Sequence, residues 1–103
     1  MSINFKDSLV DGKLTYGFDG DLDMVEAPFV KGEILKKVAE VDFSELIMDF
    51  EKLNFIDSSG IGMLFFLQKQ LVKDNKTISV VNTPDGIAQI LKLSSLDKLI
   101  SVS

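Results

Sequence analysis

The sequence predicts an α/β domain built on a mixed, partly parallel sheet. Stretches in which apolar residues alternate or run together are followed by stretches with helical spacing, and turn residues separate them. The expected order is two strands, then helix, strand, helix, strand and helix. This alternation favours helices packed on a sheet with parallel neighbours. We expect four to five strands and about four helices in a single domain over residues 1–103.

The first two strands are expected in residues 3–20, "INFKDSLVDGKLTYGFDG", with a turn at Asp11 and Gly12. Alternate positions on either side of this turn are apolar: Ile3, Phe5 and Leu9 before it, and Leu14, Tyr16 and Phe18 after it. The stretch predicts a β-hairpin.

The first helix is expected in residues 26–42, where apolar residues recur at helical spacing. They are Ala27, Val30, Ile34, Val38 and Val41. Pro28 suits the first turn of this helix. The run "ELIMDF", residues 45–50, is almost continuously apolar, which is typical of an interior strand that is covered on both faces.

A second helix is expected after Gly60, and "KDNKT" ends it with turn residues. "TISVVN", residues 77–82, predicts another interior strand. Residues 83–100 predict a helix followed by a second, short one. Thr83 and Pro84 suit the cap and the first position of the longer helix.

The composition excludes several classes of function. The chain has no cysteine and no histidine, so disulfides, thiolate zinc sites and the usual base of a serine nucleophile are absent. The net charge of −5 argues against nucleic acid binding and favours a basic or mixed-charge protein partner. No apolar run is long enough for a membrane helix, and the first residues do not read as a secretory signal. We expect a cytoplasmic protein.

The segment "LNFIDSSGIGMLFFLQKQL", residues 53–71, places two hydroxyls between an apolar run and a helix. Asp57, Ser58 and Ser59 are each suited to cap the helix, and Gly60 and Gly62 permit a tight turn and close packing on the sheet. The nucleophile elbow and the phosphate-binding loop are absent, since neither glycine pattern is present. The remaining interpretation is that a serine of this segment accepts a phosphate group, because a helix N-terminus tolerates added negative charge.

Two other features bear on binding. Asp19, Asp21 and Asp23 alternate as at the start of a calcium loop, but Met24 and Val30 stand where that loop needs Gly and Glu, so no calcium site is predicted. In the helix after Gly60, Ile61, Leu64, Phe65, Leu71 and Val72 form one apolar arc. Met63 and Phe66 lie off this arc. Their exposure would indicate a protein interface, and a helix buried over most of its surface is the alternative.

The chain resembles the STAS-domain anti-sigma factor antagonists of bacteria. The resemblance rests on "GDLD", on "LIMDFEKLNFIDSSGIGMLFFL", in which D-S-S-G-I-G is the most specific part, and on "ILKLSSLDKLISV". It implies a STAS fold and no enzymatic activity or cofactor. It implies a GHKL-type serine-kinase anti-sigma factor that phosphorylates Ser58, with Ser59 as a second candidate, and a PP2C-type phosphatase that reverses this.

The resemblance also implies a partner-binding surface. Its expected residues are Asp23, Asp57, Ser58, Ser59, Gly60, Ile61, Gly62, Met63 and Phe66. We expect a monomer in the free form. The alternative is a STAS domain without phosphorylation, which acts as a scaffold or holds an anion or nucleotide at the helix N-terminus. A last alternative is Mg²⁺ held by Asp19, Asp21, Asp23 and Asp57.

Overall fold

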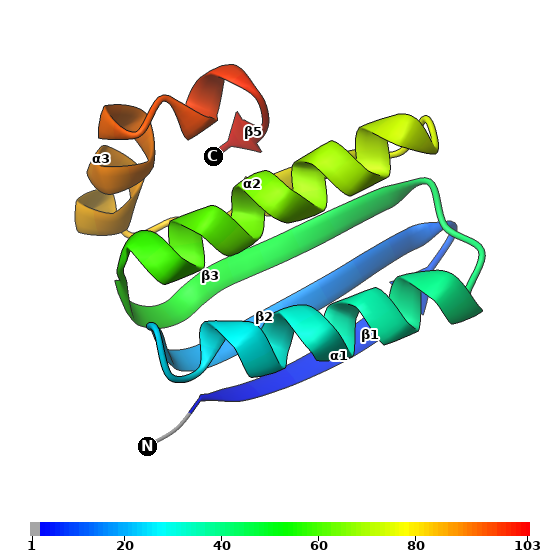
Figure 1. The fold of residues 1–103 in the computed structure, drawn as a ribbon, viewed down its shortest axis with the longest axis horizontal. Helices are drawn as coiled ribbons and strands as arrows, with labels where there is room; N and C mark the ends of the chain where they lie inside the picture. The colour runs from blue at the N-terminus through cyan, green and yellow to red at the C-terminus, as the bar shows by residue number, and fades with distance from the viewer. Residues whose placement is uncertain (1–2) are drawn as a thin grey trace.

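A five-stranded sheet forms the centre of the fold in the computed structural model, which describes residues 3–103. Figure 1 shows the elements in chain order. They are β1 (Asn4–Val10), β2 (Lys13–Leu22), α1 (Ala27–Glu40), β3 (Glu45–Ile56), α2 (Ser58–Lys73), β4 (Thr77–Val81), α3 (Asp85–Leu93), the 3₁₀-helix η1 (Leu96–Lys98) and β5 (Ser101–Val102). The strands lie side by side in the order β1-β2-β3-β4-β5. Since β1 is antiparallel to β2 and the other pairs are parallel, the prediction of a mixed sheet is confirmed.

The hairpin between β1 and β2 turns at Asp11 and Gly12, as predicted. Both residues have positive φ, 51° and 78°. Two adjacent residues with positive φ are the mark of a type I′ turn, whose twist matches that of the strands it joins. The turn therefore sets the register in which Phe5 pairs with Phe18 and Leu9 with Leu14.

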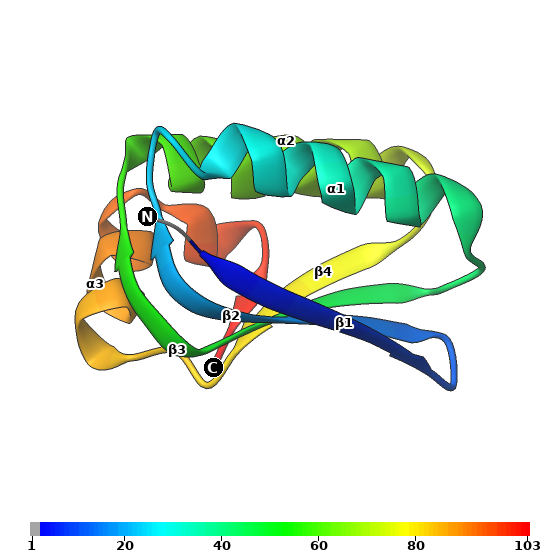
Figure 2. The same cartoon turned by 90° about the horizontal axis from the view of Figure 1, so that it is seen from below.

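One face of the sheet packs against α1 and α2, which lie side by side above it in Figure 2. Alternate residues of β2 and β3 are buried under these helices: Leu14, Tyr16, Phe18, Leu46, Met48 and Phe50. Phe5 on β1 lies 6.0 Å from Phe18, between ring centroids, and 6.0 Å from Phe29 of α1. These ring contacts hold the edge strand β1 to the core.

Strand β3 is twice as long as the predicted apolar run, because it continues from Phe50 to Ile56. Its pairing with β2 shifts register between Gly17 and Asp19, and again between Gly20 and Asp21. Such bulges bend a strand and increase its twist. The ends of β2 and β3 curl toward the starts of α1 and α2 (Figure 2), and this places Leu22 and Ile56 next to the turn that carries the serines.

The C-terminal part differs from the prediction in detail. The described residues form three α-helices and one 3₁₀-helix, so the second short helix is η1. Pro84 is the N-cap of α3 and not its first residue, and the Oγ1 atom of Thr83 is buried without a hydrogen bond, so the prediction of a Thr83 cap is wrong. The short strand β5 was not predicted.

Candidate functional site

The turn between β3 and α2 places Ser58 at the first position of α2, with its side chain exposed. No side-chain hydrogen bond joins its hydroxyl to the rest of residues 3–103. Ser59 follows at the second position and is half-buried. Neither Ser58 nor Ser59 therefore caps the helix.

Asp57 caps α2. Its Oδ1 atom accepts hydrogen bonds from the backbone N–H groups of Ser59 at 2.8 Å and Gly60 at 3.2 Å. These groups have no partner inside the helix, so the carboxylate satisfies them, and its negative charge is favourable at the helix start. The helix cap therefore does not use the hydroxyl of Ser58.

The same carboxylate also binds the loop between β2 and α1. Its Oδ2 atom accepts a hydrogen bond from the N–H of Met24 at 3.0 Å. Asp23 stands next to it, and its Oδ1 atom accepts from the N–H groups of Val25 and Glu26, each at 3.0 Å. Asp57 therefore joins the two loops, and Asp23 orders the backbone of its own loop beside the Met24 N–H that Asp57 accepts from.

Gly60 is required by packing. A Cβ atom at this position would lie 2.6 Å from Cγ1 of Ile56 and 2.6 Å from the carbonyl oxygen of Leu22. The predicted close packing is therefore correct for Gly60. It is wrong for Gly62, where a Cβ atom would meet nothing within 4 Å.

The prediction that Met63 is exposed is wrong. Only 3% of its surface is accessible, and it packs in the core beside Leu64 and Leu67. Val72, expected on the apolar arc, is exposed instead. The buried stripe of α2 runs through Gly60, Met63, Leu64, Leu67 and Leu71, so it is rotated about the helix axis from the expected arc. Phe66 is exposed over 36% of its surface, as predicted, and Nζ of Lys31 lies 4.4 Å from its ring centroid.

The outer surface of α2 near Ser58 is formed by residues four apart. Ser58, Gly62 and Phe66 are all exposed and share one stripe, since residues at this spacing lie on one face of a helix. Ile61 is partly buried against the core. Among the acidic residues of the described chain, no group of three or more is arranged to hold a metal ion, so the Mg²⁺ arrangement of Asp19, Asp21, Asp23 and Asp57 is not formed.

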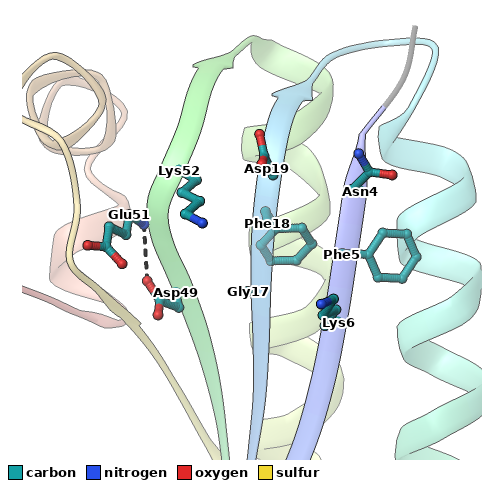
Figure 3. Close-up of a pocket in the computed structure, with 9 residues that line it drawn as sticks. All are labelled: Asn4, Phe5, Lys6, Gly17, Phe18, Asp19, Asp49, Glu51 and Lys52. Carbon is teal, nitrogen blue, oxygen red and sulfur yellow. Dashed lines mark hydrogen bonds between the residues drawn. The ribbon is translucent and has the colours of Figure 1, made fainter.

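A hollow lies elsewhere, on the sheet around Gly17 (Figure 3). It measures about 550 Å³ and is open to solvent. Lys6, Asp19 and Lys52 stand over it, whereas Phe5 points toward α1. Asp49 accepts a hydrogen bond from the N–H of Glu51 at 3.0 Å and another from Asn82 at 3.2 Å. The hollow is shallow, has both signs of charge and does not contain the serines.

The sheet order and the two covering helices define the STAS fold. The chain belongs to the STAS domain family, whose family model matches residues 4–103. Solved structures with this fold include an anti-sigma factor antagonist from Mycobacterium paratuberculosis, with a TM-score of 0.87 and 27% identity, covering 98% of this chain and 85% of that one. The unphosphorylated anti-sigma factor antagonist SpoIIAA gives a TM-score of 0.84 at 20% identity, covering 97% and 88%.

The chain is also similar in sequence to proteins from two bacteria. The anti-sigma-B factor antagonist of Staphylococcus aureus is 21% identical over 103 residues, which is 100% of this chain and 94% of that protein. A STAS-domain containing protein of Pseudomonas aeruginosa is 30% identical over 57 residues, 55% of this chain and 56% of that protein. Within residues 3–103, no helix has the length and apolar character that crossing a membrane requires.

Proposed function

We propose that this protein is an anti-sigma factor antagonist that is switched by phosphorylation of Ser58. The observation that carries the proposal is the division of roles at the start of α2. Asp57 satisfies the free N–H groups, and among residues 3–103 the exposed Ser58 hydroxyl has no side-chain hydrogen-bond partner. A hydroxyl in this position can be modified without breaking a hydrogen bond of the fold.

The comparisons support the same function. The relative in Staphylococcus aureus is an anti-sigma-B factor antagonist, and it aligns over the whole of this chain. SpoIIAA, an anti-sigma factor antagonist, has been solved in an unphosphorylated and in a phosphorylated form, and both share this fold, with TM-scores of 0.84 and 0.75. An antagonist of this fold can therefore carry a phosphate.

In this proposal the partner, and not the chain itself, catalyses the phosphorylation of Ser58. A GHKL-type serine-kinase anti-sigma factor would bind the unmodified protein and transfer the γ-phosphoryl group of ATP to Oγ of Ser58. The bond between that group and ADP breaks as the new P–O bond forms, and the hydroxyl proton passes to a base of the kinase. A PP2C-type phosphatase would hydrolyse the ester. In this scheme the chain catalyses nothing, needs no cofactor, works in the cytoplasm and is a monomer when free.

Phosphate on Ser58 would act through charge. It adds about −1.5 to −2 charges beside the carboxylate of Asp57 at neutral pH. The N-terminus of α2 accommodates this charge, because the helix dipole is positive there. In the complex this charge would face the phosphates of the nucleotide that the kinase holds at Ser58, and the two would repel each other, so the fold remains and the complex is lost.

The proposed partner-binding residues fall into two groups by burial. Ser58, Gly62 and Phe66 are exposed, and Asp23, Asp57, Ser59 and Ile61 are half-buried, so a partner can touch all seven. Gly60 and Met63 are buried, and we assign them the role of supporting the surface from below.

The alternative, an anion or nucleotide at the N-terminus of α2, is less well supported. Oδ1 of Asp57 already takes the N–H groups of Ser59 and Gly60 that an anion would need, and its negative charge opposes one. Calorimetry with GTP, ATP and inorganic phosphate tests this directly. Binding at micromolar concentration that Ser58→Ala leaves unchanged would favour the alternative.

The deciding experiment is phosphorylation with purified proteins. Each GHKL-type serine kinase of the source genome is mixed with ATP and the chain, and intact mass and peptide mapping locate the phosphate. We expect one kinase to add a single phosphate to wild type and to Ser59→Ala, but none to Ser58→Ala. Ser58→Asp should fold and fail to bind that kinase. If no kinase modifies Ser58, or if Ser58→Asp binds as tightly as wild type, the proposed switch is wrong.

A further inference from the structure

We propose that Met24 and Val25 form the apolar anchor by which the kinase partner docks beside Ser58. This rests on the proposed function and adds a surface that the motif around the serines does not include. The two side chains lie in the loop between β2 and α1 and are exposed over 68% and 73% of their surface. They contribute nothing to the core, and two neighbouring exposed apolar side chains beside Ser58 are suited to contact a partner.

The loop that presents these side chains is rigidly held. The backbone N–H groups of Met24, Val25 and Glu26 are consecutive, and each donates to a carboxylate oxygen at 3.0 Å. The acceptors are Asp57 for the first and Asp23 for the other two. The carbonyl oxygen of Asp23 also accepts from the N–H of Ala27 at 2.8 Å, which begins α1. These hydrogen bonds order the backbone of the loop while the side chains of Met24 and Val25 face solvent.

A fixed and exposed apolar pair is suited to binding a protein. Ordering a flexible loop reduces affinity, and a loop that is ordered beforehand avoids this loss. Small clusters of well-packed apolar side chains supply most of the free energy of many interfaces, with polar residues around them. Here the surrounding polar groups are the carboxylates of Asp23 and Asp57 and the hydroxyl of Ser58, which fits a partner with an apolar pocket bordered by basic or donor groups.

The position of Met24 and Val25 beside Ser58 indicates which partner contacts them. Asp57 binds the Met24 N–H through Oδ2 and caps α2 through Oδ1, and Ser58 is the next residue. Any kinase that brings ATP to the Ser58 hydroxyl must therefore cover or adjoin the loop. Asp57 acts as a positioning residue, because it keeps the anchor and the acceptor serine at a constant separation.

The anchor is tested by a double substitution, Met24→Ser with Val25→Ser. The probe is the purified kinase that phosphorylates Ser58 in the experiment above. We expect its Kd to rise about tenfold or more and its KM for the chain to rise in parallel. The kcat at saturation and the Tm of the chain should change little, since both side chains are exposed. Leu93→Ser is the matched control, because Leu93 of α3 is 79% exposed and lies on another element.

The positioning role is tested by Asp57→Asn, which keeps one carbonyl oxygen for the helix cap but replaces the second acceptor with an amide. Hydrogen exchange measured by NMR should accelerate at the Met24 amide more than at the Gly60 amide. Binding of the same kinase should weaken, and kcat should fall less than KM rises. Fast exchange of the Met24 and Val25 amides in the wild type would show that the loop is not held, and would overturn the proposal without any partner.

The outcomes separate this proposal from the proposed function. If wild type is phosphorylated on Ser58 and the double variant binds the kinase as tightly, the anchor is wrong and the function stands. If the Leu93→Ser control weakens binding as much as the double variant does, the anchor is also wrong. If no kinase binds or modifies the wild type, the proposed function is wrong, and the proposed anchor is then wrong as well.

Discussion

The backbone of α2 at Gly60 lies against the carbonyl oxygen of Leu22, at a distance that leaves no room for a Cβ atom. The same oxygen accepts a hydrogen bond from the N–H of Asp57 at 3.2 Å. The end of β2 is therefore joined to the turn before α2 by a hydrogen bond and by close contact. This joint sets where Ser58 stands on the surface.

Gly60→Ala should destabilise the fold, although alanine is the better helix former. The added methyl group would meet backbone and a buried isoleucine side chain at 2.6 Å, and overpacking of this kind costs about 1–3 kcal/mol. Gly62→Ala is the matched control. It has open space, so it should stabilise by about 0.5–1 kcal/mol. Denaturant unfolding measures the change in the free energy of unfolding for each variant. Changes of the same sign would contradict the packing assigned to Gly60.

Asp57→Ala should lower the free energy of unfolding by about 1–2 kcal/mol, because the helix loses its cap. The N–H of Met24 loses its acceptor as well. Ser58→Ala, one residue away, should change the same quantity by less than about 0.5 kcal/mol, since surface substitutions without structural partners have little effect. Thermal unfolding at neutral pH compares the two. A larger loss for Ser58→Ala would place the capping function on the serine.

Met63→Ala should cost about 2–5 kcal/mol, because it opens a cavity in the core. Phe66→Ala should cost less, about 1–2 kcal/mol, since 36% of the residue is already exposed and the substitution loses the remaining covered area and the contact with Lys31. Urea unfolding gives both values. The order of the two would be reversed if Met63 faced solvent.

Tyr16 should make the fold sensitive to alkali. Burial, and then the charges of Asp7, Glu33 and Glu40, raise its pKa from 10.0 to about 12. Between these values the unfolded chain loses the phenol proton while the folded chain retains it, so stability is complete below pH 10 and falls as pH rises toward 12. Tyr16→Phe should flatten this part of the stability curve. Because Tyr16 is the chain's single tyrosine and there is no tryptophan, tyrosinate absorbance measures its titration directly; a midpoint near 10 would contradict the shift.

Much of the fold could be predicted because its signals are local. The positive φ values at Asp11 and Gly12, and the alternation of Leu14, Tyr16 and Phe18, follow from residue types next to one another in sequence. The continuation of β3 to Ile56 was not predictable in this way, because bulges interrupt the alternation after Phe50. Strand β5 has two residues and forms only because β4 is already there to pair with it.

The candidate site was predictable in part for the same reason. Asp57, Ser58 and Gly60 are adjacent, so a pattern could identify them, but which residue caps the helix depended on side-chain geometry. Met63 was misjudged because the direction of the buried stripe depends on the elements that pack against α2, which are α1, β3 and β4. Met24 and Val25 were missed altogether. Their only sequence signal is an apolar pair after Asp23, and the bond to Asp57 spans 33 residues.

The strands lie side by side in the order in which they occur in the chain. During synthesis, each strand that leaves the ribosome can pair at once with one that is already made, and no strand has to insert between two others. Neighbouring pairings also keep loop closure short, which favours fast folding. The segment after α3 then adds β5 to the edge of β4 and buries Leu96 and Ile100. Until β5 is made, the edge of β4 is unpaired, and an unpaired strand edge is a site at which a nascent chain can aggregate.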